Sequence, residues 1–205
     1  TINKIDNMDF HGREAYKTLR TNLLFCGSDV KSIAITSCTP NEGKTTVSLN
    51  LAKSLAESGK RVLLIDADLR KSVMVTYCRV NQAIKGFSHY LSGQSSFGDV
   101  VYGTDTANLH IIFAGHVPPN PAELLGSQTF KMTIEKLKTI YDYIIIDCPP
   151  SLNTLTVNAM TTADTVLVPI QCEYYALEGL SQLIHTVNLV KERLNPELDM
   201  EGVVF

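Results

Sequence analysis

The stretch "CTPNEGKT", from Cys38 to Thr45, constrains the fold of this chain more than any other feature. It follows the short apolar, β-branched run "SIAIT" and precedes a helical pattern from Val47 to Ser58, which Gly59 ends. A glycine-lysine-threonine turn in this context places backbone amide groups and the start of a helix around phosphate oxygens. A chance surface turn does not require a strand before it and a helix after it. We therefore expect a phosphate-binding loop.

The residue types of this loop have separate tasks. Gly43 lets the backbone approach the phosphates, Lys44 reaches the outer phosphates, and the hydroxyl of Thr45 ligates Mg²⁺. Cys38 stands where the first glycine of the pattern normally lies. The residues expected to bind the nucleotide are Thr39, Pro40, Asn41, Glu42, Gly43, Lys44, Thr45 and Thr46.

Aspartates follow two of the apolar strand patterns. "RVLLIDADLR" ends in Asp66 and Asp68, and "YDYIIIDCPP" ends in Asp147. Alternate residues of a strand point to the same side, so Asp66 and Asp68 are expected to face one magnesium and phosphate region. A lone strand-end aspartate more often serves a turn or a cap. The combination of these aspartates with one phosphate loop favours a site for a magnesium-bound triphosphate.

Strand and helix patterns alternate along the chain. Further strands are expected at "LHIIFA", "DTVLVPI" and "EGVVF", and helices at residues 13–25, 129–140, 156–163 and 176–194. This alternation predicts an α/β fold, a mostly parallel sheet flanked by helices, in a single domain over residues 1–205. A parallel α/β domain seldom ends on an uncovered strand, so the pattern suggests a chain truncated at its C-terminus.

Composition excludes several other classes of protein. The net charge of −3 gives no whole-chain basic signature, so no specific nucleic-acid partner is expected. No apolar run is long enough to span a bilayer. The five cysteines are odd in number and lack metal-ligand spacing, which favours a reducing, cytoplasmic location.

The motifs together resemble a known family. "TSCTPNEGKTTVSLNLA", "LLIDADLRKS" and "YDYIIIDCPP" are similar to the bacterial tyrosine kinases of capsule and exopolysaccharide synthesis, within the MinD/ParA group of P-loop ATPases. "EAYKTLRTNLLF" resembles the self-association helix of these kinases, and "GHVPPNPAELLGS" resembles their Pro-rich loop and following helix. This resemblance runs from Glu14 to Pro150.

The resemblance implies ATP and Mg²⁺ as cofactors and transfer of the γ-phosphate to tyrosine hydroxyls. Lys44, Asp66 and Asp68 would be the catalytic residues, with Asp66 or Asp68 activating the incoming hydroxyl. Thr45, Asp66 and Asp147 would hold the metal. General chemistry agrees, because phosphoryl transfer needs positioning, Mg²⁺ and a carboxylate that accepts the proton of the acceptor.

The resemblance also implies partners. Residues 1–28 would form the self-association helix and residues 29–205 the nucleotide-binding core, with Glu14, Lys17 and Arg20 joining copies of the chain into a ring or dimer. Lys17 replaces the family's arginine and loses its planar fork, so this contact would be weaker. Without the resemblance, these side chains would be a solvated helix face with an i, i+3 pair. Tyrosine-bearing proteins would be substrates, and a membrane-embedded activator would recruit the chain to the inner face of the membrane.

The last third of the chain resembles a different branch. Residues 151–205, above all "VPIQCEYYALEGLSQL", are similar to the ParA/Soj partition ATPases. Those proteins carry an extra lysine in the phosphate loop where this chain has Thr39, which weighs against a partition switch. Against the kinase, no tyrosine cluster closes the sequence, and Tyr174 and Tyr175 suit packing or surface positions better than acceptor sites. We expect complete triphosphate contacts and incomplete contacts to the base.

Three functions therefore stay open. The first is a protein-tyrosine kinase, the second a partition-type ATPase that hydrolyses ATP, and the third a nucleotide-binding scaffold without transfer. Loss of turnover in Lys44→Ala separates either enzyme from the scaffold. Arg70 and Lys71, which follow the paired aspartates, fit phosphate contact and a solvated turn equally well.

Overall fold

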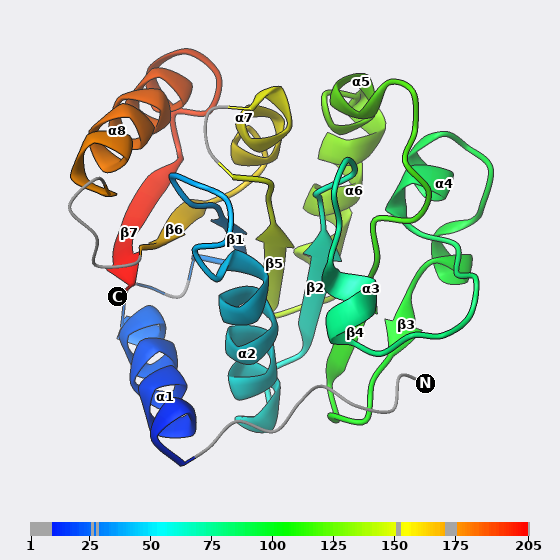
Figure 1. The fold of residues 1–205 in the computed structure, drawn as a ribbon, viewed down its shortest axis with the longest axis horizontal. Coiled ribbons are helices and arrows are strands. Elements are labelled where there is room, and N and C mark those ends of the chain that lie inside the picture. Colours follow the sequence, from blue (N-terminus) through cyan, green and yellow to red (C-terminus); the bar gives the residue numbers. More distant parts are fainter. Residues whose placement is uncertain (1–9, 26, 28, 151–152, 171–175, 205) are drawn as a thin grey trace.

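A seven-stranded sheet forms the centre of the molecule (Figure 1). The computed structural model describes residues 10–25, 27, 29–150, 153–170 and 176–204, without the side chains at 176–178, 201 and 203. The strand order is β3-β4-β2-β5-β1-β6-β7, and every neighbouring pair is parallel except the antiparallel pair β3 and β4. The expected mostly parallel α/β fold is confirmed.

The elements have the following bounds. The strands are β1 (Ser32–Ile35), β2 (Val62–Asp66), β3 (Tyr102–Gly103), β4 (Leu109–Ile112), β5 (Tyr143–Asp147), β6 (Thr165–Pro169) and β7 (Asp199–Val204). The helices are α1 (Phe10–Phe25), α2 (Lys44–Glu57), α3 (Met74–Tyr77), α4 (Phe87–Leu91), α5 (Pro121–Leu125), α6 (Gln128–Leu137), α7 (Thr154–Met160) and α8 (Ala176–Arg193), with a short 3₁₀ turn η1 (Phe97–Asp99).

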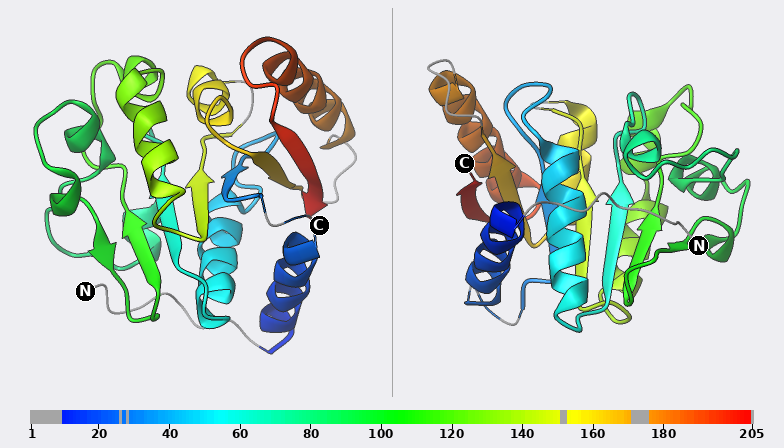
Figure 2. Two further views of the ribbon diagram at one scale, coloured as in Figure 1. Left: turned by 180° about the vertical axis from the view of Figure 1, so that it is seen from behind. Right: turned by 60° about the horizontal axis from the view of Figure 1, so that its bottom comes forward.

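Helices cover both faces of the sheet, as the apolar strands require. One face packs against α1, α2 and α3, and the strand residues on this side include Ile33, Leu64 and Ile145. The other face packs against α4 to α8, which lie in front of the sheet when the molecule is seen from behind (Figure 2, left). The strand residues on that side include Leu63 and Ile146, because successive side chains of a strand alternate between faces.

The strands expected from apolar runs are all present. The strand patterns at "SIAIT", "RVLLID", "LHIIFA", "YDYIIID", "DTVLVPI" and "EGVVF" match β1, β2, β4, β5, β6 and β7 within a few residues. Helix α2 ends as expected at Gly59, whose φ of 88° is the left-handed conformation that glycine adopts without strain. Strand β3 and the short helices α3 and α4 were not predicted, because two to five residues show no clear periodicity.

Within the described part of the chain, no helix is both long and apolar enough to cross a membrane. Tyr174, Tyr175, Cys26 and Cys172 lie outside the described residues, so the structure does not address what the sequence suggests for them. Cys38, Cys78 and Cys148 are buried free thiols.

Candidate nucleotide site

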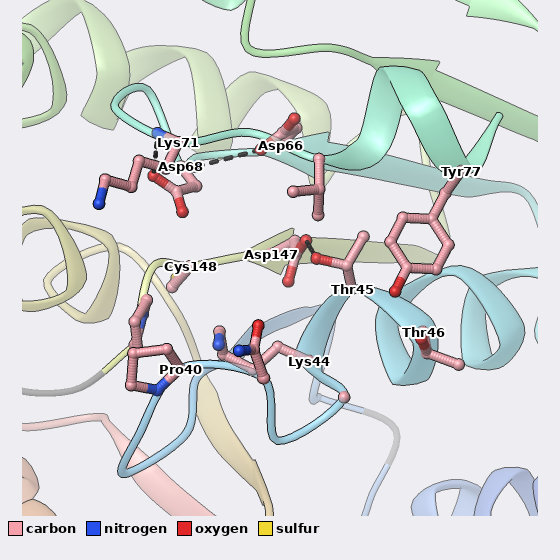
Figure 3. Close-up of a pocket in the computed structure, with 14 residues that line it drawn as sticks. Pro40, Lys44, Thr45, Thr46, Asp66, Asp68, Lys71, Tyr77, Asp147 and Cys148 are labelled. Carbon is pink, nitrogen blue, oxygen red and sulfur yellow. Dashed lines mark hydrogen bonds between the residues drawn. The ribbon is translucent and has the colours of Figure 1, made fainter. Parts of the chain in front are cut away.

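A pocket of about 410 Å³ opens at the carboxyl ends of β2 and β5, beside the loop that joins β1 to α2 (Figure 3). This is the edge at which open α/β sheets bind ligands. The pocket is lined by Pro40, Asn41, Gly43, Lys44, Thr45, Thr46, Asp66, Asp68, Lys71, Val73, Tyr77, Asp147, Cys148 and Pro150. The structure therefore gathers most of the predicted loop and all three predicted aspartates around one cavity.

The phosphate loop is held in shape by its own side chains. Gly43 has a φ of 82°, which lets the chain turn directly into α2. The carboxylate of Glu42 is buried and accepts a hydrogen bond of 2.7 Å from the backbone N–H of Thr39. Thr39 and Glu42, which the sequence placed among the nucleotide-binding residues, are not among the residues that line the pocket. Their visible contact shapes the loop.

Lys44 is only 9% exposed, an unusual position for an amine. Burial lowers the pKa of Lys44, while the carboxylates of Asp147, Asp68 and Glu42 act in the opposite direction. An ammonium placed against carboxylates at the start of a helix is well suited to bind phosphate oxygens.

Thr45 and Asp147 join the loop to the end of β5. The Thr45 hydroxyl donates a hydrogen bond of 2.7 Å to one carboxylate oxygen of Asp147, and the Ser48 hydroxyl donates one of 3.0 Å to the other. Burial raises the pKa of Asp147 to about 6, although the hydrogen bonds from Thr45 and Ser48 and the charge of Lys44 oppose this shift. Asp147 is thus a buried carboxylate with both oxygens fixed.

Asp66 is buried at the end of β2 and is 1% exposed. Its carboxylate accepts hydrogen bonds from the Ser72 hydroxyl and, at 3.2 Å, from the backbone N–H of Asp68. Burial and the neighbouring charge of Asp147 raise the pKa of Asp66 to about 8. A carboxyl with a pKa near neutrality can hold or release a proton under ordinary conditions.

Asp68 lies half-buried at the pocket wall and organises the turn that follows β2. Its carboxylate accepts backbone hydrogen bonds from Arg70 at 3.2 Å and Lys71 at 2.9 Å. Lys71 lines the pocket, whereas Arg70 is exposed and does not. Sequence alone favoured neither cation, and the structure places Lys71, but not Arg70, at the pocket.

The oxygen donors around Thr45 and Asp147 fit a magnesium ion bound together with phosphates. Among the described residues, no group of three or more His, Cys, Asp or Glu side chains converges as a metal site made of protein alone. Mg²⁺ usually takes one or two carboxylates and completes its shell with water and substrate phosphates. A hydroxyl and a carboxylate in contact supply such a partial set of hard oxygen ligands.

The predicted self-association residues lie on α1, away from the pocket. Glu14 and Lys17 form an ion pair of 2.7 Å in which both side chains are about half exposed. Arg20 instead donates a hydrogen bond of 2.7 Å to the backbone carbonyl of Ser54 on α2. The surface pair is worth a few tenths of a kcal/mol at most. Arg20 fastens α1 to the rest of the same chain, and its role between copies stays a prediction.

Two features of the site could not be found from the sequence. Val73, directly before α3, and Tyr77, the last residue of α3, line the pocket together with Lys71. Gly179 at the start of α8 packs against the phosphate loop, where a Cβ atom added to it would lie 2.8 Å from the Cβ of Cys38. The only sequence signal for the second contact was that Cys38 replaces a glycine of the motif.

Comparisons with known proteins agree with this geometry. A family model described as an AAA domain matches residues 30–200. The sporulation initiation inhibitor protein Soj of Bacillus subtilis is 42% identical over 190 residues, which cover 85% of this chain and 72% of Soj. The tyrosine-protein kinase CpsD of Streptococcus agalactiae is 44% identical over 155 residues, which cover 73% of this chain and 68% of CpsD.

This chain belongs to the MinD/ParA-type P-loop ATPases. Both resemblances expected from the sequence are confirmed, and the similar members of the family divide between tyrosine kinases and partition proteins.

Solved structures of this P-loop ATPase family show the same fold. The kinase domain of the Escherichia coli tyrosine kinase ETK superposes with a TM-score of 0.83 at 30% identity and covers 93% of this chain and 75% of its own. The cobyrinic acid a,c-diamide synthase of Mycobacterium smegmatis, solved with a bound ATP analogue and magnesium, has a TM-score of 0.74 at 28% identity and covers 85% of this chain and 74% of its own. Binding of ATP and Mg²⁺ is typical of this P-loop family.

Proposed function

We propose that this P-loop ATPase is a protein-tyrosine kinase that regulates exopolysaccharide or capsule synthesis. The observation that carries the proposal is the phosphate loop itself. Thr39 stands where the partition ATPases have their extra lysine, and the structure shows its backbone held by Glu42 inside the loop. A loop without that lysine lacks the cation that would reach a partner's nucleotide. The identity to CpsD supports the same branch.

The proposed reaction assigns a task to each residue of the pocket. Lys44 and the amides of the phosphate loop would hold the phosphate oxygens, and Thr45, Asp66 and Asp147 would hold the metal. Bound Mg²⁺ would neutralise charge that develops on the phosphates. The phenol oxygen of the acceptor tyrosine bonds to the γ-phosphorus, and Asp66 takes the phenol proton. The bond from the γ-phosphorus to the bridging oxygen breaks, and ADP departs with that oxygen. Asp68 holds the adjacent turn and is the alternative proton acceptor.

Asp66 is the better candidate for the base on structural grounds. It lines the pocket and is 1% exposed, so bulk water has little access to its carboxylate. Asp68 is half-buried and holds the turn after β2 through the backbone N–H groups of Arg70 and Lys71. Asp68→Asn should therefore retain more activity than Asp66→Asn.

The partners follow from the kinase branch. We infer that the chain works with a membrane-embedded activator, assembles with copies of itself through the α1 helix, and phosphorylates tyrosines of other proteins. A membrane-bound activator would bring it to the inner face of the cell membrane.

A partition-type ATPase switch remains the second candidate. The observation that favours it is the match to Soj, which covers more of this chain than the match to CpsD does. In that function water replaces the tyrosine as acceptor, and the same loop and aspartates serve. A nucleotide-binding scaffold is the third candidate, in which the pocket binds ATP without turnover.

A transfer assay tests the proposal. The protein is incubated with ATP, Mg²⁺ and a random copolymer of glutamate and tyrosine, and phosphotyrosine is measured on the copolymer and on the protein. We expect phosphotyrosine with the wild type and a loss of about 100-fold or more in Lys44→Ala. Lys131→Ala, an exposed lysine on α6, is the matched control. ATP hydrolysis without phosphotyrosine would support the partition-type switch, and no turnover would support the scaffold.

A further inference from the structure

An exposed apolar pair borders the polar phosphate pocket. Val73 and Tyr77 are each 48% exposed and both line the pocket. The neighbouring lining residues on that side, Asp66, Asp68 and Lys71, are charged. Phosphate binding gives no reason to keep an apolar surface open to water at this place, so the pair requires its own explanation.

Buried neighbours in the chain hold Val73 and Tyr77 in place. Between its two members, Met74 is fully buried in the core, and Cys78, directly after Tyr77, is 2% exposed. The backbone N–H of Tyr77 donates a hydrogen bond of 3.1 Å to the carbonyl of Val73, so the two side chains lie one turn apart on the same face. The buried side chains of Met74 and Cys78 anchor α3 in the core. Val73 and Tyr77 therefore face the pocket.

The pair also lies next to the proposed reaction centre. Ser72, the residue before Val73, donates its hydroxyl hydrogen bond to Asp66. In the close-up, the Tyr77 ring extends from α3 toward the start of α2, where Thr45 and Thr46 lie (Figure 3). A flat group packed on Val73 and Tyr77 would therefore lie beside the metal-binding and proton-accepting residues.

We propose that Val73 and Tyr77 form an acceptor platform, which packs against the phenol ring of the substrate tyrosine and places its hydroxyl at the γ-phosphate. This inference rests on the proposed kinase function and names the surface that recognises its substrate. An aromatic ring gains from both area burial and ring–ring contact on such a surface. A water molecule needs no platform, so the pair also provides a reason for transfer to tyrosine over hydrolysis.

The platform makes Tyr77 a positioning residue, and binding tests it directly. The probe is the random glutamate–tyrosine copolymer, titrated by calorimetry into the protein saturated with Mg²⁺ and a non-hydrolysable ATP analogue. We expect Tyr77→Ala to weaken copolymer binding about 5- to 20-fold and Val73→Ser somewhat less. Tyr77→Phe keeps the ring and should bind like the wild type. Met132→Ala, an exposed apolar residue on α6 outside the pocket, is the matched control.

The binding and kinetic outcomes separate the platform from its alternatives. In a transfer assay, Tyr77→Ala should raise the KM for the copolymer by a larger factor than it lowers kcat, and Tyr77→Phe should restore the KM. Unchanged copolymer affinity in Tyr77→Ala would overturn the platform. An equal or larger loss of affinity for the ATP analogue would also overturn it, because the ring would then belong to the nucleotide site.

Two further results distinguish failure of the platform from failure of the kinase. Copolymer binding that depends on the ring at residue 77, without any transfer by the wild type, would sustain the platform and reject the kinase. Transfer that is lost in Tyr77→Phe, with the phosphate mapped to Tyr77 itself, would reject the platform, because Tyr77 would be an acceptor.

Discussion

The Thr45 hydroxyl hydrogen-bonds to the Asp147 carboxylate over 2.7 Å and so connects the first turn of α2 to the end of β5. These elements come from sequence positions about a hundred residues apart, and the parallel sheet brings them together through the pairing of β1 with β5. The contact places two hard oxygen donors side by side. It is the structural basis for expecting that metal binding and phosphate binding share one centre.

Asp147→Asn should weaken the binding of Mg²⁺ to the nucleotide-bound protein. The amide keeps one acceptor oxygen in place of two, so it can accept from only one of the Thr45 and Ser48 hydroxyls, and it lacks the charge that Mg²⁺ requires. We expect the affinity for Mg²⁺ in the presence of an ATP analogue to fall about 10- to 100-fold. Asp142→Asn is the matched control. It makes the same change directly before β5, where Asp142 forms a surface ion pair of 2.9 Å with Arg61. Calorimetric titration of Mg²⁺ in the presence of an ATP analogue measures both, and equal behaviour of the two variants would exclude Asp147 as a ligand.

Lys71 and Arg70 offer a test of which cation meets the nucleotide. Lys71 lines the pocket and Arg70 does not. Because the Lys71 side chain is exposed and screened by solvent, Lys71→Ala should weaken ATP affinity only about 2- to 5-fold. Arg70→Ala should leave the affinity within error of the wild type. The comparison requires low and high salt, since the Lys71 effect should shrink as ionic strength rises. A larger effect from Arg70→Ala would contradict the observed arrangement.

The contact between Gly179 and Cys38 predicts a coupled pair. A methyl group at residue 179 would lie 2.8 Å from the Cβ of Cys38, so Gly179→Ala should cost about 1–3 kcal/mol in free energy of unfolding. It should also weaken ATP binding, because the loop that moves is the phosphate loop. Gly98→Ala is the control, since nothing lies within 4 Å of a Cβ there.

Cys38→Gly should rescue Gly179→Ala. Removing the Cys38 side chain frees the space that the new methyl group needs, so the double variant should be more stable than the sum of the single changes predicts. Urea denaturation of the four proteins measures this coupling. Strict additivity would mean that α8 and the phosphate loop do not touch as described.

Asp164 predicts a pH dependence of stability. Its carboxylate accepts hydrogen bonds from the backbone N–H groups of Lys31 at 2.9 Å and Ser32 at 2.8 Å, and from the Lys138 ammonium at 2.7 Å. Burial alone would raise the pKa of Asp164, but these three donors outweigh it and hold the pKa below the ordinary value. Because the folded state favours the ionised form, the contribution is complete above the unfolded pKa, near pH 4, and is lost as the pH falls through the folded value.

Asp164→Asn should therefore lower the free energy of unfolding by about 2 kcal/mol at neutral pH. The difference between wild type and variant should shrink steadily below about pH 4. Urea denaturation at pH 7, 5, 4 and 3 measures it. A difference that grows toward acid would have the wrong sign and would contradict the assigned hydrogen bonds.

The parts of the site that sequence predicts are those whose signal is local. Gly43, Lys44 and Thr45 lie in one continuous motif, and Asp66 and Asp147 each end an apolar run that is long enough to identify a buried strand. The carboxyl ends of parallel strands meet at one edge, so their convergence follows from the fold class.

The parts that the sequence could not predict depend on contacts between distant or very short elements. Tyr77 belongs to a helix of four residues, which has no measurable period. The bond from Arg20 to Ser54 depends on how α1 packs against α2. The motif predicts Glu42 to bind the nucleotide. In the structure its carboxylate turns inward and accepts a hydrogen bond from the backbone N–H of Thr39 in the same loop.

The fate of the γ-phosphate tests the central claim most directly. In a single turnover with γ-labelled ATP, Mg²⁺ and the glutamate–tyrosine copolymer, label on protein or copolymer tyrosine is measured against free phosphate, with a glutamate–phenylalanine copolymer as the control acceptor. We predict that most of the label appears on tyrosine, that it is absent from the phenylalanine copolymer, and that Lys44→Ala abolishes it. Label released only as free phosphate, at the same rate with either copolymer, would contradict the kinase and identify a partition-type ATPase.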